Sequence, residues 1–391
     1  MLTIAGLAAL PAQAADWRAS GFGALESRFF LHDNAPPASH RANQSLVVQP
    51  EFFTEWNDRR DSFTFVPFLR VDEHDGERTH FDIRELTWLH AARDWELRAG
   101  IRKVFWGVTE SRHLVDVINQ TDLVENIDGE DKLGQPMLNL ALIRDWGTVD
   151  FFVLPGFRER TFPGRDGRLR SVPRVEGGRA RYESGAGRNQ VDLAARWSHY
   201  IGNWDIGVSH FHGTSREPRF ELDLSDPRDI VLVPVYEKID QSGLDIQYTR
   251  GSWLWKLEAI RRSGQGEDFS AAVGGFEYTY YGVFDTAVDL GVLAEYQYDG
   301  RGSALATPFD DDLFTGFRLN LNDAQSTAML LGCISDLEST ARFCSVEASR
   351  RLGSSWVLSL EARIFSEPPE NDPLFSLRRD DYLQLELAFH F

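Results

Sequence analysis

This sequence of 391 residues lacks long apolar runs and net positive charge, and it contains only two cysteines. No stretch reaches the roughly 18 consecutive apolar residues that a membrane-spanning helix needs, which excludes a helical membrane protein. Two cysteines are too few for a disulfide framework or a cysteine-based metal cluster. The net charge is −19, and there is no long run of Lys or Arg, so we expect no nucleic-acid partner.

The remaining composition predicts a large folded body, since 42% of the residues are hydrophobic and 12% are aromatic. Residues 1–15 form an uncharged apolar run with a proline and end in small residues, including Ala12 and Ala14. This pattern predicts a secretory signal, cleaved near Ala15 or Asp16. The basic start of such a signal is lacking, because the first cation is Arg18, which suggests a start that is incomplete. A buried N-terminal helix is the alternative.

From Trp17 onward, apolar and polar residues alternate in segments of about ten, a pattern typical of half-buried strands. In the last segment Leu383, Leu385, Leu387 and Phe389 share one face, and polar residues occupy the other. A soluble sandwich and a barrel in lipid both fit a period of two. Charged residues on the polar faces suit a wet lumen, and Trp and Tyr at the strand ends suit an interfacial girdle, so the barrel is favoured.

Short and long connections alternate along the chain, as expected for periplasmic turns and outer loops of a transmembrane antiparallel up-and-down β-barrel. Counting the segments between them gives about 18 strands, with 16 as the alternative. We expect one barrel domain over residues 16–391, with both termini on the side of the short turns. The chain resembles the Gram-negative outer-membrane β-barrels, in its signal-like start, its strand rhythm and its final strand DDYLQLELAFHF.

That resemblance implies location in the outer membrane of a Gram-negative bacterium, contact with its lipid and lipopolysaccharide, and recognition of the terminal Phe391 by the barrel-insertion machinery. It identifies a porin-like class and no narrower family. It leaves open whether the protein is a monomer or a homo-oligomer such as a trimer.

The segment 107–135 is strongly acidic, with a net charge of about −5, and it also has an apolar rhythm that a solvated loop does not need. We therefore expect it to fold into the lumen as a constriction loop, as the long third loop of porins does. A solvated outer loop is the alternative. Its candidate acidic residues are Glu110, Asp116, Asp122, Glu125 and Asp128. The facing wall would be a basic ladder formed by Arg70, Arg84, Arg98 and Arg102.

The segment 156–188 has nine arginines against four acidic residues, which is unusual in an acidic protein. As a cationic mouth it would collect anions, with lipopolysaccharide binding or simple solvation as the alternatives. The candidate outer-loop arginines are Arg158, Arg160, Arg165, Arg168, Arg170 and Arg174.

Cys333 and Cys344 flank a predicted hairpin loop and either form a structural disulfide or stay as two thiols on separate faces. We expect no metal and no cofactor, because no acidic cluster has the spacing of an EF-hand. We also expect no enzyme, since none of the histidines stands in a hydrolase motif.

The function predicted from the sequence is passive diffusion of small polar or anionic solutes through an arginine-lined lumen. An exporter of an acidic polysaccharide would share such a lumen and is the first alternative. A hydrolase at the barrel rim is the second.

Overall fold

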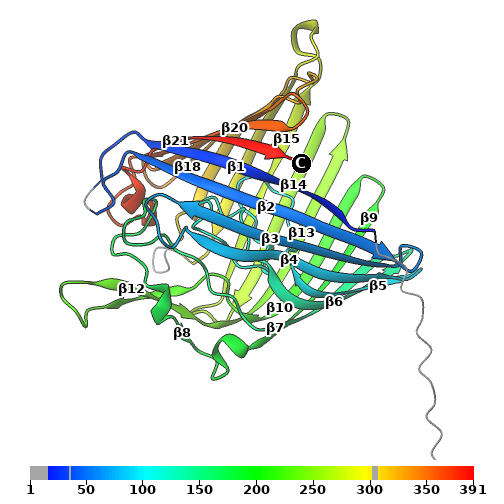
Figure 1. Ribbon diagram of the computed structural model, residues 1–391, viewed down its shortest axis with the longest axis horizontal. Helices are drawn as coiled ribbons and strands as arrows, with labels where there is room; N and C mark the ends of the chain where they lie inside the picture. Colours follow the sequence, from blue (N-terminus) through cyan, green and yellow to red (C-terminus); the bar gives the residue numbers. More distant parts are fainter. Residues whose placement is uncertain (1–15, 35–36, 302–306) are drawn as a thin grey trace, which may run out of the picture.

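A computed structural model describes residues 16–34, 37–301 and 307–391, so the predicted signal segment 1–15 lies outside the described residues. The chain forms one closed antiparallel barrel of 18 strands, which confirms the fold class and the higher of the two expected strand counts (Figure 1). The barrel strands are β1 (Arg18–Phe30), β2 (Ala42–Trp56), β3 (Asp61–Asp72), β4 (His80–Ala91), β5 (Trp95–Arg102), β6 (Gln135–Arg144), β7 (Gly147–Pro155), β9 (Val191–Ile201), β10 (Trp204–Thr214), β13 (Lys238–Arg250), β14 (Trp253–Ser263), β15 (Phe269–Tyr280), β16 (Asp289–Asp299), β17 (Asp311–Asn320), β18 (Ala328–Asp336), β19 (Arg342–Leu352), β20 (Trp356–Ser366) and β21 (Tyr382–His390).

The barrel closes where the first and last strands meet. Strands β1 and β21 pair antiparallel, with Phe22 opposite His390 and Phe30 opposite Tyr382. Gly21 and Phe391 also exchange two backbone hydrogen bonds of 3.1 and 3.2 Å. Figure 1 shows these two strands, blue and red, side by side. Closure removes both sheet edges, so the backbone groups of every barrel strand are paired with a neighbour.

The alternation of each strand places apolar side chains outside and polar ones inside. On β1 to β3 the outward residues Leu25, Leu46 and Leu69 are 46 to 58% exposed, whereas the inward residues Glu26 and Arg70 are buried. In a barrel this exposed apolar surface is the face that meets lipid. No helix among the described residues is long and apolar enough to span a membrane.

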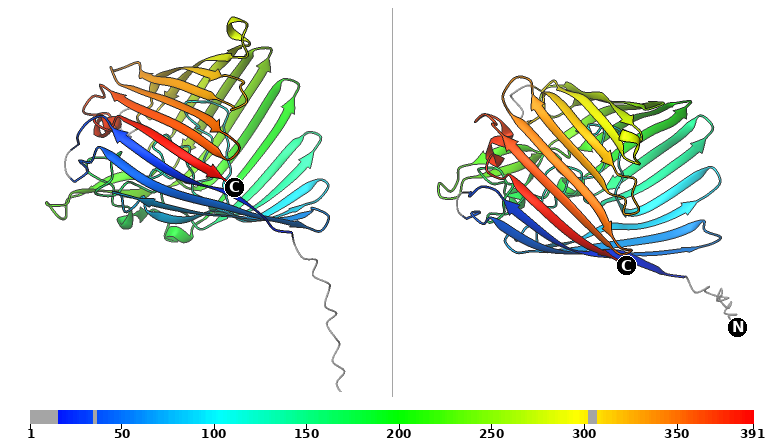
Figure 2. Two further views of the ribbon diagram at one scale, coloured as in Figure 1. Left: turned by 45° about the horizontal axis from the view of Figure 1, so that its top comes forward. Right: turned by 90° about the horizontal axis from the view of Figure 1, so that it is seen from above.

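Aromatic residues line the outer face near the short turns. The rings of Trp204 and Tyr248 lie 4.4 Å apart, those of Trp253 and Tyr278 4.6 Å apart, and Trp356 contacts Phe389. An amphipathic ring is favoured at the boundary between lipid and water, so this belt marks one membrane interface. The belt lies at the end of the barrel where β1 begins and β21 ends. Figure 2 shows the start of β1 and the C-terminus at this same end, as predicted for the two termini.

Long connections leave the other end of the barrel. Two of them form a small three-stranded sheet of β8 (Arg181–Tyr182), β11 (Arg219–Asp223) and β12 (Val231–Tyr236), which the sequence analysis did not predict. Short helical turns η1 (Gly177–Arg179) and η2 (Gly187–Asn189) flank β8 in the connection from β7 to β9, and η5 (Pro373–Leu377) lies in the connection from β20 to β21. A further turn, η3 (Val283–Asp285), lies in the short connection between β15 and β16.

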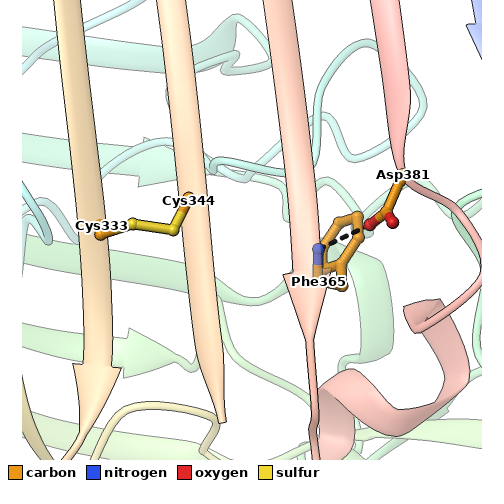
Figure 3. Close-up of a disulfide and its surroundings, with 4 residues drawn as sticks. All are labelled: Cys333, Cys344, Phe365 and Asp381. Carbon is orange, nitrogen blue, oxygen red and sulfur yellow. Dashed lines mark hydrogen bonds between the residues drawn. A yellow bond between two sulfur atoms is a disulfide. The ribbon is translucent and has the colours of Figure 1, made fainter.

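Cys333 and Cys344 are joined by a disulfide across the neighbouring strands β18 and β19 (Figure 3). The two residues face each other directly in the register, with Cα atoms 4.1 Å apart. The alternation of β18 puts Cys333 on the outer face, because Ile334 beside it is buried in the lumen. On the next hairpin, a carboxylate oxygen of Asp381 accepts a 2.7 Å hydrogen bond from the backbone amide of Phe365 (Figure 3).

Candidate functional site

The connection from β5 to β6, residues 103–134, lies inside the barrel, and we call it the inner loop. It corresponds to the predicted segment 107–135 and starts four residues earlier. Val115 and Ile118 of this loop are fully buried. They belong to an apolar cluster that includes Phe211 of β10, Ile260 of β14 and wall residues of β6, β7, β9, β13 and β15. The apolar rhythm in the sequence is therefore the side of the loop that packs on this wall.

Glu258 of β14 holds one part of the inner loop through the loop backbone. Its Oε1 accepts hydrogen bonds from the backbone amides of Val108 (2.7 Å) and Thr109 (3.0 Å) and from the Thr109 hydroxyl (2.7 Å). Its Oε2 accepts a 3.2 Å bond from the amide of Val115. The side chain is fully buried, so these amides replace water around the carboxylate.

Glu295 of β16 holds the next residues in the same way. Its carboxylate accepts hydrogen bonds from the backbone amides of Glu110 (2.8 and 3.0 Å) and Ser111 (2.8 Å), and from the Ser111 hydroxyl (2.7 Å). Both carboxylates belong to the charged polar strand faces that suit a wet lumen, and neither was predicted to have a role of its own. No sequence signal distinguishes a carboxylate that binds loop amides from one that faces water.

Two arginines of the basic ladder, Arg70 and Arg84, contact the inner loop. Arg70 Nη2 lies 2.6 Å from Glu125 Oε2, and Arg70 also binds Glu26. Arg84 Nη1 lies 2.6 Å from Asp122 Oδ2. The expected arrangement, with basic and acidic walls facing each other across an aperture, is wrong for these two arginines. Because a buried charge needs a partner at hydrogen-bond distance, loop and wall meet in direct ion pairs.

The other two ladder residues, Arg98 and Arg102 of β5, are partly buried and have fewer acidic partners than Arg70 and Arg84. Both guanidinium groups donate to Asn139 of β6, at 3.3 and 2.9 Å, and Arg98 also forms an ion pair with Glu96. All four ladder arginines therefore lie on the lumen face of β3 to β5. Only Arg98 and Arg102 form no ion pair with a carboxylate of the inner loop, which the structure describes throughout.

The other candidate acids of the inner loop pair with cations in different places. Glu110 binds Arg318 of β17 (2.6 Å) and Lys256 of β14 (3.4 Å). Asp116 lies 3.2 Å from Lys132 within the loop itself. The outermost, Asp128, reaches the opposite wall at Arg363 of β20. The loop is thus fixed to β3 and β4 on one side and to β14, β17 and β20 on the others.

The arginine-rich connection does not form the free cationic mouth that we expected. Three of the six candidate arginines bind carboxylates from elsewhere in the chain, each at 2.7 or 2.8 Å: Arg158 binds Asp82, Arg168 binds Asp380 and Arg174 binds Asp229. Arg160 donates to the carbonyl of Arg216 and Arg170 to that of Ser171, while Arg165 is exposed. The local surplus of positive charge is used for packing, because acidic partners distant in the sequence fold onto it.

A cavity of about 410 Å³ remains between the inner loop and the wall formed by β17 to β20. Loop residues Glu110, His113, Asp128 and Glu130 line one side. The wall side is lined by Phe314, Leu330, Ile334, Phe343, Glu347, Arg363 and Phe365, among others.

His113 and Asp128 of the inner loop, which line this cavity, both have raised pKa values. Burial lowers the pKa of His113, but the carboxylates of Glu130 (3.0 Å) and Glu258 (3.6 Å) outweigh it and raise the pKa to about 10. Burial raises the pKa of Asp128 to about 7 although Arg363 opposes this shift. His113 is therefore a cation at neutral pH, and Asp128 is partly protonated there.

Two side-chain groups among the described residues have the composition of a metal site: His80 with Asp122 and Glu125, and Asp128 with Glu347 and Glu361. Arginines already occupy the carboxylates of both groups, namely Arg84 and Arg70 in the first and Arg363 in the second. A metal ion needs several of these oxygens at once and would have to displace the guanidinium groups to reach them, so neither group supports a metal centre.

No protein-family model and no curated protein matches the sequence. Solved structures do match. A trimeric OmpT, described as an outer membrane protein of Vibrio cholerae, is 9% identical, with a TM-score of 0.49 over 97% of this chain and 100% of that one. A mutant of the Rh. blastica porin is 11% identical, with a TM-score of 0.47 over 96% of this chain and 100% of that one.

These likenesses are too distant to identify residues or activities, so the class rests on this chain's own structure. The barrel is closed, its exposed outer face is apolar with an aromatic belt at the short turns, and its lumen holds the charged side chains. This combination is the architecture of barrels that cross the outer membrane. The protein is an outer-membrane β-barrel of the Gram-negative type.

Proposed function

We propose that the protein is an outer-membrane channel for passive diffusion of small polar solutes, in which the inner loop narrows the lumen. The observation that carries this proposal is the placement of the loop. It packs on the β6 to β15 side of the wall and leaves a cavity of about 410 Å³ toward β17 to β20. A loop anchored on several walls sets the size of the solutes that pass.

The finer part of the prediction was an arginine-lined lumen with a preference for anions. Arg98 and Arg102 on the lumen face of β5 support it. Arg70 and Arg84 support it less, because each is neutralised by a carboxylate at 2.6 Å. We therefore propose that the channel passes small polar solutes in general. The residues that line the cavity would set its preference for charge.

The partners that we propose follow from the barrel class. Outer-membrane lipid surrounds the apolar belt, and lipopolysaccharide is the expected contact of the exposed Arg165 at the loop end. Phe391, which pairs with Gly21 at the closing seam, is the residue we propose for recognition by the insertion machinery. A homo-oligomer would form through the outer face of the wall.

The test is single-channel conductance of the refolded protein in a planar bilayer. Deleting residues 110–130, with a short glycine linker in their place, is expected to raise the conductance several-fold, because the lumen loses its filling. Trimming the outer hairpin at residues 221–233 is the control, and it is expected to leave the conductance within about twofold. Absence of conductance in the folded wild-type protein and in the inner-loop deletion would contradict the proposal.

The alternative functions give different results in the same experiment. An exporter of an acidic polysaccharide needs unpaired cations along its lumen, and the ion pairs of Arg70 and Arg84 remove two of them. A rim hydrolase would show turnover that depends on a histidine. His210 and His212 lie on the exposed outer face of β10, with 56 and 51% of their side chains accessible, which gives this alternative no support.

A further inference from the structure

The wall of the cavity is apolar on a side where a barrel lumen is normally polar. Phe314 of β17, Ile334 and Leu330 of β18 and Phe343 of β19 pack together on the lumen face. Phe365 of β20 continues this surface, and its ring centroid lies 5.3 Å from that of Phe343. Apolar surface that lines a wet cavity is unfavourable unless an apolar group covers it. Leu330 and Phe343 are only partly buried, so this wall offers apolar surface to a solute with an apolar body.

Carboxylates surround the same cavity. Glu130 of the inner loop and Glu347 of β19 line it, with 53 and 48% of their side chains exposed. Nearby, the single guanidinium of Arg363 forms ion pairs with Asp128 and Glu347, both at 2.8 Å, and with Glu361 at 3.4 Å. One cation shared by three carboxylates leaves the group with excess negative charge.

His113, the cation on the inner-loop side of the cavity, does not remove this excess negative charge. His113 lies 3.0 Å from Glu130 and 3.6 Å from Glu258, so it too is shared between two carboxylates. Arg363 and His113 are the basic residues of the cavity lining, and both are already engaged. An anionic solute would find acceptors where it needs donors, whereas a cation would find exposed carboxylate oxygens.

We propose that this cavity is a binding site for small amphipathic cations, with the ammonium group at the carboxylates of Glu130 and Glu347. The apolar body of the solute would lie against Phe314, Leu330 and Phe343. Aromatic faces at this wall also suit a quaternary ammonium group. A cavity of about 410 Å³ is in the range of small-molecule sites. That such a cation also permeates rests on the channel function proposed above, whereas its binding does not.

The test is equilibrium binding to the refolded protein in detergent, measured by calorimetry with three probes. Benzyltrimethylammonium has both the charge and the apolar body, tetramethylammonium lacks the body, and benzenesulfonate carries the opposite charge. We expect the first to bind about tenfold or more tightly than either of the others, because it alone uses both sides of the cavity.

A matched pair of variants locates the site. Glu347→Gln is expected to weaken benzyltrimethylammonium binding by about two- to tenfold, the range for a partly exposed charge pair. Glu51→Gln is the control. Glu51 lies on the lumen face of β2, four residues from the inward Val47, and is exposed away from the cavity. The Glu51→Gln variant removes the same charge from the lumen and should leave benzyltrimethylammonium binding unchanged.

The outcomes separate the two proposals. Equal or tighter binding of benzenesulfonate would overturn the inference, as would equal weakening by the Glu51 and Glu347 variants. If the protein conducts ions but binds none of the probes, the channel proposal stands and the binding site does not. If benzyltrimethylammonium binds as expected but the folded barrel does not conduct, the channel proposal fails and the cation site remains.

Discussion

Arg70 on the barrel wall and Glu125 on the inner loop form a bidentate ion pair in the lumen. Arg70 Nε donates to both carboxylate oxygens of Glu125, at 2.9 and 3.0 Å, and Nη2 donates to Oε2 at 2.6 Å. Both side chains are buried, with 6% of each accessible. A pair of this kind fixes the orientation of the loop as well as its distance from the wall, because the planar guanidinium fits the carboxylate in one arrangement.

Removing this pair should release the inner loop on that side. Arg70→Gln leaves Glu125 buried without its arginine partner, whereas Glu26 keeps Arg78, and loss of a buried partner typically costs about 3 to 5 kcal/mol. Since the barrel itself is held by its strands, we expect the cost to appear as local opening of the loop. Limited proteolysis of the embedded protein should then cut residues 118–130 faster, while Arg102→Gln should not change the rate.

The loop amides bound by Glu295 should be strongly protected from hydrogen exchange. Glu295→Gln keeps one acceptor oxygen but loses the charge that strengthens each bond, about 1 to 2 kcal/mol in all. The amides of Glu110 and Ser111 are expected to exchange about 5- to 30-fold faster, as measured by mass spectrometry. Glu51→Gln serves as the control, and equal rates in both variants would contradict the role assigned to Glu295.

His113 should titrate far above the usual range for histidine. Its pKa is about 10, so the stabilisation of the loop by the imidazolium is fully present below pH 6.5, the pKa of a free histidine. This contribution is lost as the pH rises through 10. Histidine-selective NMR should show the shift, and Glu130→Gln should lower the pKa of His113. An apparent pKa near 6.5 in the wild-type protein would contradict the ion pair.

The disulfide between Cys333 and Cys344 should add only modest stability. It joins residues already opposite each other in the β18 to β19 register, so the loop that it closes is short. Replacing both by serine should lower the free energy of unfolding by at most about 3 kcal/mol. Urea unfolding in lipid vesicles measures this change, and the channel conductance should stay the same because the bridge lies on the outer face.

The barrel could be predicted from the sequence because its signal is local. Alternation along a strand assigns the outer and inner faces residue by residue, and the turns give the strand count. The partners of lumen charges could not be predicted, since they depend on register and loop folding. Arg70 and Glu125 are 55 residues apart, and Thr109 and Glu258 are 149 apart. The local surplus of arginine after residue 156 was misleading for the same reason.

The closing seam between β1 and β21 has a consequence for the order of assembly. Phe22 and His390 are neighbours in space but come from opposite ends of the chain. Until β21 has been synthesised and delivered, β1 and β20 each present an unpaired edge on a strand with an apolar face. A partial product therefore offers two templates for aggregation, and its ring cannot form gradually from one end. Growth of the sheet and sealing of the ring are separate events, and we expect the second to set the rate of maturation.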